Sequence, residues 1–308
     1  MSANAEPSLR NVECMRNTFI QMANELHESG KLTHIYDFYN YYCNDVCNDD
    51  MSYDIINAGE HYKEISIHLK ESIYHTYEKT VTVLKAIIDS YDWIIRINIS
   101  SYINIKLLDK FISIADENMI YCNAINSIIN DNTYLNELYP RGDFIMFSNK
   151  TLHKIIPHMN KFIFCDHSLE DRIDVTHVDD CLLGCVIIDT FGRSYYKKLQ
   201  LINYNYIPYN NVDTKHYNEY AIASRVKTLI PGVNYSGYSW KDNEFRKFDV
   251  LKMKKLNEIV QQCEYNDISL NDILVDEKHQ RPTLFVSMAN VPIKTFKEYL
   301  SRKNKGEN

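Results

Sequence analysis

The chain has 308 residues, a net charge of −7 and 45% hydrophobic residues, enough for one large domain or two modest ones with a real core. The acidic balance argues against nucleic acid or an anionic membrane as a partner. No run of about 18 apolar residues is present, so we expect no membrane span. Near residue 1 there is no apolar signal-like core, so we expect a cytoplasmic protein with reduced thiols.

Hydrophobic spacing predicts an alternation of helices and strands along the chain. Helical periodicity covers 9–29, 63–90, 104–117, 149–159, a segment that starts near 179, and 247–262. Apolar or alternating runs predict strands at 30–42, 52–59, 92–100, 119–125 and 143–148. Such an alternation is typical of an α/β fold with a mainly parallel sheet flanked by helices.

Four local patterns follow one another in a fixed order along the chain. They are "YEKTVTVLKAI" (77–87), "DWIIRINISSYIN" (92–104), "YPRGDFIMFSNKTLHKI" (139–155) and "VDDCLLG" (178–184). Their order and spacing resemble the inverting GT-A glycosyltransferases of the β-1,3-galactosyl/N-acetylglucosaminyltransferase type, and most of all the soluble bacterial and giant-virus relatives of those enzymes. The tripeptide "RGD" at 141–143, as an isolated motif, is interpreted as chance.

The resemblance implies a single GT-A-like domain over 1–262, with a donor side at about 10–117 and an acceptor side at about 118–262. Residues 263–308 are expected to form a C-terminal extension packed on that domain. The implied reaction moves a sugar from a nucleotide donor, a UDP-sugar, to a carbohydrate acceptor in polysaccharide biosynthesis. The alternative is a non-catalytic GT-A-like domain that binds a glycan or a protein, and an unrelated α/β protein is a third possibility.

A general base is the first requirement of an inverting transfer, because the acceptor hydroxyl must lose a proton as it attacks the donor. A carboxylate at a helix N-terminus is well placed for this, since the backbone N–H groups keep it ionised. The resemblance assigns this role to Asp180 in "VDDCLLG", with Asp179 in the preceding acidic position. The alternative is that Asp179 only caps the helix.

The donor side is unusual because the strand that ends in aspartates in animal members here ends in Asn98, Ser100 and Ser101. These side chains can donate hydrogen bonds to a diphosphate but bind Mn²⁺ or Mg²⁺ poorly. The sequence therefore predicts no metal site at this strand end, although Mn²⁺ or Mg²⁺ dependence stays open. Instead, cationic side chains would neutralise the leaving diphosphate. The candidates for this role are Arg225 and Lys227, for which the alternative is a solvated strand edge, and Arg96, for which the alternative is a structural ion pair. The resemblance implies that Lys79 and Glu71 contact the nucleotide base and ribose.

The acceptor side is assigned to the segment around Tyr139 and Gly142. Glycine lets the backbone approach a sugar closely, and a tyrosine ring can stack on a sugar face. Ser148 is expected to cap the helix that follows it. A turn followed by a core strand would explain the same residues.

Overall fold

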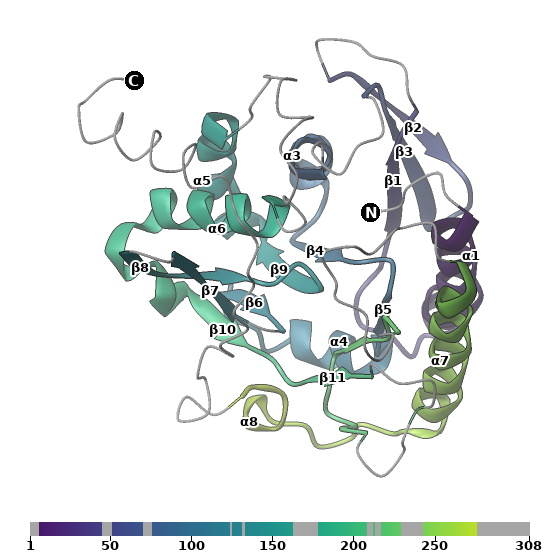
Figure 1. Cartoon of the computed structure of the whole chain (residues 1–308). Helices are drawn as coiled ribbons and strands as arrows, with labels where there is room; N and C mark the ends of the chain where they lie inside the picture. The colour runs from purple at the N-terminus through teal and green to yellow at the C-terminus, as the bar shows by residue number, and fades with distance from the viewer. Residues whose placement is uncertain are drawn as a thin grey trace.

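The computed structural model has a mixed α/β fold (Figure 1). The residues that it describes are 6–44, 51–69, 76–123, 125–130, 133–162, 178–207, 212, 217–228 and 243–275. The helices are α1 (Glu6–Met15), α2 (Gln21–Glu28), α3 (Thr76–Ile87), α4 (Ile105–Ile112), α5 (Asn149–Met159), α6 (Val178–Phe191), α7 (Asn243–Gln262) and α8 (Leu270–Ile273). The strands are β1 (Phe38–Cys43), β2 (Tyr53–Asn57), β3 (Tyr62–Ile67), β4 (Trp93–Ile97), β5 (Ser101–Ile103), β6 (Ile120–Cys122), β7 (Ile125–Asn130), β8 (Thr133–Pro140), β9 (Phe144–Ser148), β10 (Leu199–Leu201), β11 (Tyr204–Tyr206) and β12 (Ala223–Arg225).

The described strands form three small mixed sheets and one antiparallel hairpin. The sheet orders are β1-β3-β2, β10-β6-β9-β4 and β11-β12-β5, and β7 pairs with β8. Each three- or four-stranded sheet contains one parallel pair, and its other pairs are antiparallel. The α/β class is confirmed, but the prediction of a single, mainly parallel sheet is wrong.

The direction of β9 explains much of that difference. This strand lies between β4 and β6 and runs antiparallel to both. The segment that leads into β9 is the β7–β8 hairpin, which turns the chain back without the long crossover that a parallel neighbour requires. Apolar runs identify buried strands, but they carry no information on strand direction.

Helices cover the β10-β6-β9-β4 sheet on both faces (Figure 1). Ile145 and Phe147 of β9 belong to one hydrophobic core, which α3, α5 and α6 share. Phe144 and Met146 alternate with them and belong to the other core, shared by α4 and α7. All of β9 is therefore buried, as expected for a strand with helices on both sides.

Two predicted helices take a different form in the structure. Residues 63–90 were expected to be one helix, but Tyr62–Ile67 is strand β3 and the helix begins only at Thr76 in the described part. Residues 9–29 are helical but contain a π-helical turn at Arg16–Ile20. Within this turn Thr18 leaves helical geometry, with φ −128° and ψ −107°, and its Oγ1 donates to the Cys14 carbonyl at 2.6 Å.

The described part of the C-terminal extension packs against the rest of the chain. The Val275 N–H donates to the Leu201 carbonyl at 3.1 Å, and the Asn104 side chain donates to the Tyr265 hydroxyl at 2.6 Å. Residues 276–308 lie outside the described residues, so the predicted division of the chain stays a prediction. Among the helices described, none combines the length and the apolar character that crossing a bilayer would take.

Candidate functional site

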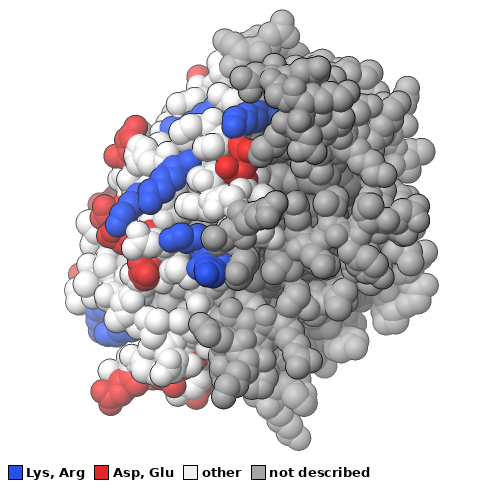
Figure 2. Space-filling view, turned by 90° about the vertical axis from the view of Figure 1, so that its left-hand side faces the viewer, with Lys and Arg blue, Asp and Glu red and all other residues white. Residues whose placement is uncertain are grey.

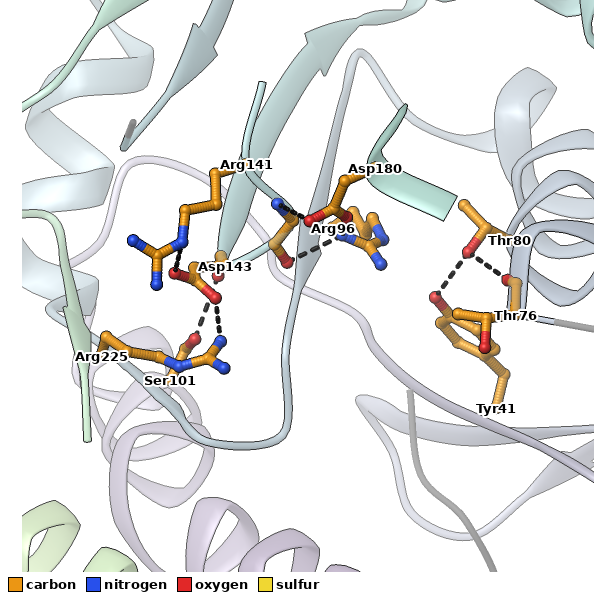
Figure 3. A network of polar contacts seen from close by, with 10 residues as sticks. Tyr41, Thr76, Thr80, Arg96, Ser101, Arg141, Asp143, Asp180 and Arg225 are labelled. Carbon is orange, nitrogen blue, oxygen red and sulfur yellow. Dashed lines mark hydrogen bonds and ion pairs between the residues drawn. The ribbon is translucent and has the colours of Figure 1, made fainter. Parts of the chain in front are cut away.

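Three residues predicted for the site meet around one carboxylate (Figure 3). Asp180, in the first turn of α6, accepts a hydrogen bond from Arg96 Nη1 at 3.2 Å and another from the Gly142 N–H at 2.8 Å. Arg96, on β4, also donates to the Gly142 carbonyl at 2.8 Å. The Arg96 side chain is 4% exposed and that of Asp180 is 15% exposed, so this ion pair is largely shielded from water.

Close approach of two side chains favours glycine at position 142. A β-carbon built there would overlap Asp180 Oδ1 and Arg96 Nη1, and it would lie 2.7 Å from Asp180 Cγ. The sequence analysis explained Gly142 by a close approach of its backbone to a sugar. In the structure, the groups that approach Gly142 closely are Asp180 and Arg96.

A second carboxylate, Asp143, holds two arginines beside this cluster (Figure 3). Arg225, on β12, donates through Nη1 to Asp143 Oδ1, and Arg141 Nε lies 2.8 Å from Oδ2. Burial alone would raise the pKa of Asp143, but Arg225 and Arg141 outweigh it and hold that pKa below its ordinary value. Asp143 is therefore an ionised carboxylate buried between two guanidinium groups.

Arg141 and Asp143 were missed by sequence reasoning, because their tripeptide was set aside as chance. The signal that could have found them is their position. Asp143 immediately precedes β9 and Arg141 lies two residues before Asp143, while the five residues of β9 are all apolar except Ser148. Charged side chains beside a buried strand are either paired or functional, since an unpaired buried charge is costly.

The polar turn that follows β4 shapes the backbone of the site. The Ser100 N–H and hydroxyl both lie within hydrogen-bonding distance of Asn98 Oδ1, at 3.3 and 3.2 Å, and the Ser101 hydroxyl donates to the Asp143 carbonyl at 3.0 Å. Ser100 and Ser101 are almost completely buried. The turn thereby ties β4 to Asp143, and direct contact between these three residues and a donor stays a prediction.

Two more of the predicted side chains lie among the described residues. Lys79 is buried in α3, and Lys227 is half-buried two residues after Arg225. Asp179 lies in the first turn of α6 and Tyr139 in β8, but their side chains fall outside the described residues, as does the whole of Glu71.

The start of α3 lies across from Arg96 and Asp180 in Figure 3. The Tyr41 hydroxyl lies 3.3 Å from Thr80 Oγ1, which donates to the Thr76 carbonyl at 3.0 Å. Glu78, in the same turn of α3, is 8% exposed. Its burial raises the pKa of this carboxyl to about 7. The sequence analysis gave no role to Glu78.

The charges of the cluster suit an anionic ligand better than a cation. Arg96, Arg141 and Arg225 face the carboxylates of Asp143 and Asp180, which leaves one net positive charge among these five side chains. The Nε of Arg225 is buried and has no hydrogen-bond partner in the described structure, and Asp143 Oδ2 makes no hydrogen bond of good geometry although Arg141 Nε lies 2.8 Å away. A buried donor without an acceptor calls for an explanation, and a ligand oxygen is one.

The described residues at this place do not fit a divalent metal. Both carboxylates already pair with guanidinium groups, whose positive charge opposes a nearby cation. Across the described ranges, no three His, Cys, Asp or Glu side chains gather closely enough to hold a metal ion.

A separate hollow of about 270 Å³ lies beside the π-helical turn of residues 16–20. Its wall includes the Arg16 guanidinium, which stacks over the Tyr62 ring at 4.6 Å from the ring centroid. The lining residues are Arg16, Asn17, Ile20, Gln21, Asn24, Ala58, Gly59, Glu60, His61 and Tyr62. None of the residues predicted for the site lines this hollow.

The described part of the surface in the view of Figure 2 carries both signs of charge. Lysine and arginine side chains alternate there with aspartate and glutamate on the part of the surface that is described. This pattern agrees with the net charge of −7.

Comparison with known proteins adds no relative to this account. No protein-family model matches the chain, and the search of curated proteins finds no significant match. The resemblance to glycosyltransferases therefore rests on the motifs and stays a prediction.

Proposed function

We propose that this chain is an inverting glycosyltransferase with a GT-A-like fold, which moves a sugar from a UDP-sugar to a carbohydrate acceptor in the cytoplasm. The observation that carries the proposal is the contact of Asp180 with Arg96 and Gly142. These residues come from three of the four ordered motifs, which lie far apart in the sequence. Their contact supports one shared site for these motifs.

Asp180 has the properties that a general base requires in this reaction. Arg96 and the N-terminal end of α6 favour its ionised form. A carboxylate has about four acceptor positions, so two hydrogen bonds do not exhaust it. In the proposed step the acceptor oxygen bonds to C1 of the sugar, its proton passes to Asp180, and the bond from C1 to the nucleotide diphosphate breaks. Attack from the side opposite the leaving group inverts C1.

The leaving diphosphate is the second requirement, because it departs with negative charge into a partly dry site. Arg225 is 8% exposed, and its orientation is fixed by Asp143. A phosphate oxygen near its Nε would accept a hydrogen bond from this N–H, which has no partner in the described structure. Arg141 adds positive charge beside Arg225 because both pair with Asp143, and Lys227 follows Arg225 by two residues.

The alternative, a non-catalytic binding domain, is favoured by one specific observation. Arg96 and Arg225 already form ion pairs with Asp180 and Asp143. Arginines that already pair with carboxylates of the same chain bind a diphosphate less strongly than unpaired arginines would. Activity on a nucleotide sugar therefore has to be measured directly.

The test is a donor panel of UDP- and GDP-sugars, with EDTA present and then with Mn²⁺. We expect a thermal shift with UDP and slow release of UDP from one or more UDP-sugars, both in EDTA. If no nucleotide gives a shift or turnover under either condition, the binding-domain alternative replaces the enzyme. If only Mn²⁺ restores binding, the metal-free donor site is wrong.

A further inference from the structure

Strand β2 is the outer strand of the β1-β3-β2 sheet (Figure 1). All five of its residues are exposed. Tyr53, Ile55 and Ile56 are 40%, 48% and 45% exposed, although all three are large and apolar. Natural edge strands usually carry lysine, proline or a bulge that prevents pairing with another strand. The sequence of β2, "YDIIN", contains neither lysine nor proline, and its register with β3 is unbroken. Its one charged residue, Asp54, lies 2.9 Å from His68 Nε2 of the same chain through Oδ2.

The backbone hydrogen bonds show which groups of β2 point outward. The Ser52 carbonyl accepts from the His68 N–H at 2.9 Å, and the Ala58 N–H donates to the Tyr62 carbonyl at 3.1 Å. Because hydrogen-bonded and non-hydrogen-bonded pairs alternate in an antiparallel ladder, every second residue between these two bonds to β3. The residues whose N–H and C=O groups point away from β3 are therefore Tyr53, Ile55 and Asn57.

We propose that β2 pairs antiparallel with the β2 of a second copy of this chain, across a two-fold axis at Ile55. Ile55 then pairs with the partner's Ile55, and Tyr53 pairs with the partner's Asn57 on either side. Each of these three pairs exchanges two N–H···O bonds, so all outward groups of β2 are satisfied. An axis at Ile56 would satisfy fewer of them, and an axis at Asp54 would place two like charges opposite each other.

The side chains are compatible with the same axis. Ile55 lies opposite Ile65 of β3, which is fully buried. Pairing at the axis extends this row, so that Ile65, Ile55 and the partner's Ile55 form one apolar line across the joined sheet. On the other face Asp54 lies opposite the partner's Ile56, which keeps the two carboxylates apart.

The small area that this contact buries limits the stability of the dimer. A strand edge of five residues buries less than the roughly 800 Å² per partner of a standard interface. We therefore expect a reversible dimer that forms as concentration rises, rather than an obligate one. The proposal is independent of the proposed enzyme activity.

Analytical ultracentrifugation of the full chain over a concentration series tests the proposal with two matched variants. Ile55→Lys puts two like charges opposite each other at the axis, and we expect the dimer dissociation constant to rise about tenfold or more. Ile56→Lys makes the same change at a neighbour of similar exposure. Its new ammonium group would face the partner's Asp54, so we expect the dimer to be unchanged or tighter. Circular dichroism should show both variants folded.

Amide hydrogen exchange gives a second measurement on unmodified protein. Protection of the Tyr53, Ile55 and Asn57 amides should rise with concentration, while the Asp54 and Ile56 amides, already bonded to β3, should change little. Wild-type protein that stays monomeric over the whole series overturns the proposal, and so does a dimer that both lysine variants weaken equally. If β2 instead pairs with a strand of a different protein, the purified wild-type chain would stay monomeric, which is the first of these results.

Discussion

Replacing Gly142 with alanine is the substitution whose consequence follows most directly from the structure. The new methyl group would occupy space held by Asp180 Oδ1 and Arg96 Nη1, with Asp180 Cγ 2.7 Å away. Asp180 would have to turn away and lose both its bond from the Gly142 N–H and its ion pair with Arg96. The contacted atoms belong to side chains and can move, but moving them breaks these two contacts.

The cost can be worked out from those two contacts. A hydrogen bond to a charged group contributes about 1.5–3 kcal/mol. Separating a buried ion pair costs about 3–5 kcal/mol, because a charge is left without its partner. The contacts share one carboxylate, so their costs do not add fully. We expect Gly142→Ala to lower the free energy of unfolding by about 3–5 kcal/mol.

The assay is urea unfolding of wild type and Gly142→Ala beside a matched control. At Gly59 a β-carbon would meet only Tyr62 Cβ at 3.6 Å and the Tyr62 carbonyl at 4.0 Å. Gly59→Ala should therefore stay within about 0.5 kcal/mol of wild type. In an Asp180→Ala background, Gly142→Ala should cost less, because much of the overlap has been removed. A Gly142→Ala protein as stable as the Gly59→Ala protein would refute the close approach of Asp180 and Arg96.

Three further predictions concern charged groups of the site and its surroundings. Burial raises the pKa of Glu78 to about 7, so its protonated form contributes to stability below the pKa of the unfolded chain, and this contribution is lost as pH rises through 7. Glu78→Gln should therefore be more stable than wild type at pH 8 by up to about 3 kcal/mol in urea titrations. The pKa of Asp143 is lowered, so its ionised form stabilises the fold at neutral pH and this stabilisation is lost only in acid. Asp143→Asn should therefore lower the free energy of unfolding by about 3–5 kcal/mol at pH 7 and by a smaller amount near pH 3. Arg225→Ala should weaken UDP binding in EDTA by about 1.5–3 kcal/mol in calorimetry, and an unchanged affinity would place the cationic contact elsewhere, with Arg96 next to test.

Local sequence signals predicted several elements correctly. The helix expected at 149–159 is α5, and its N-cap is Ser148, whose Oγ accepts from the Thr151 N–H at 3.0 Å. The strands expected at 92–100 and 143–148 are β4 (Trp93–Ile97), in which half-buried and buried residues alternate, and the fully buried β9. In these segments the apolar spacing and the cap agree with the tertiary contacts, so the local signal was sufficient.

Non-local pairing explains the elements that sequence reasoning missed. Residues 62–67 carry Ile65 and Ile67, which fit helical spacing with later residues and also fit the alternation of a strand. Pairing with β1 and β2 decides between these two forms, and that information lies in other segments. The antiparallel direction of β9 is a property of the same kind.

The site was predicted in part. The order of the motifs identified Asp180, Arg96 and Gly142, which lie in contact. It did not identify Asp143, because the role of this carboxylate depends on Arg225, which lies 82 residues later in the chain. The pKa of Glu78 is likewise raised by burial, which no local pattern reveals.

The most direct test of the account is Asp180→Asn, with turnover and binding measured on the same preparation. As the general base, Asp180 should be needed for transfer and not for holding the nucleotide. We predict that release of UDP from the active UDP-sugar falls by about 10²–10⁴-fold while UDP affinity stays within a few-fold. Near-normal turnover in this variant would contradict the account and make Asp179 the next candidate, and loss of UDP binding would place Asp180 on the donor side instead.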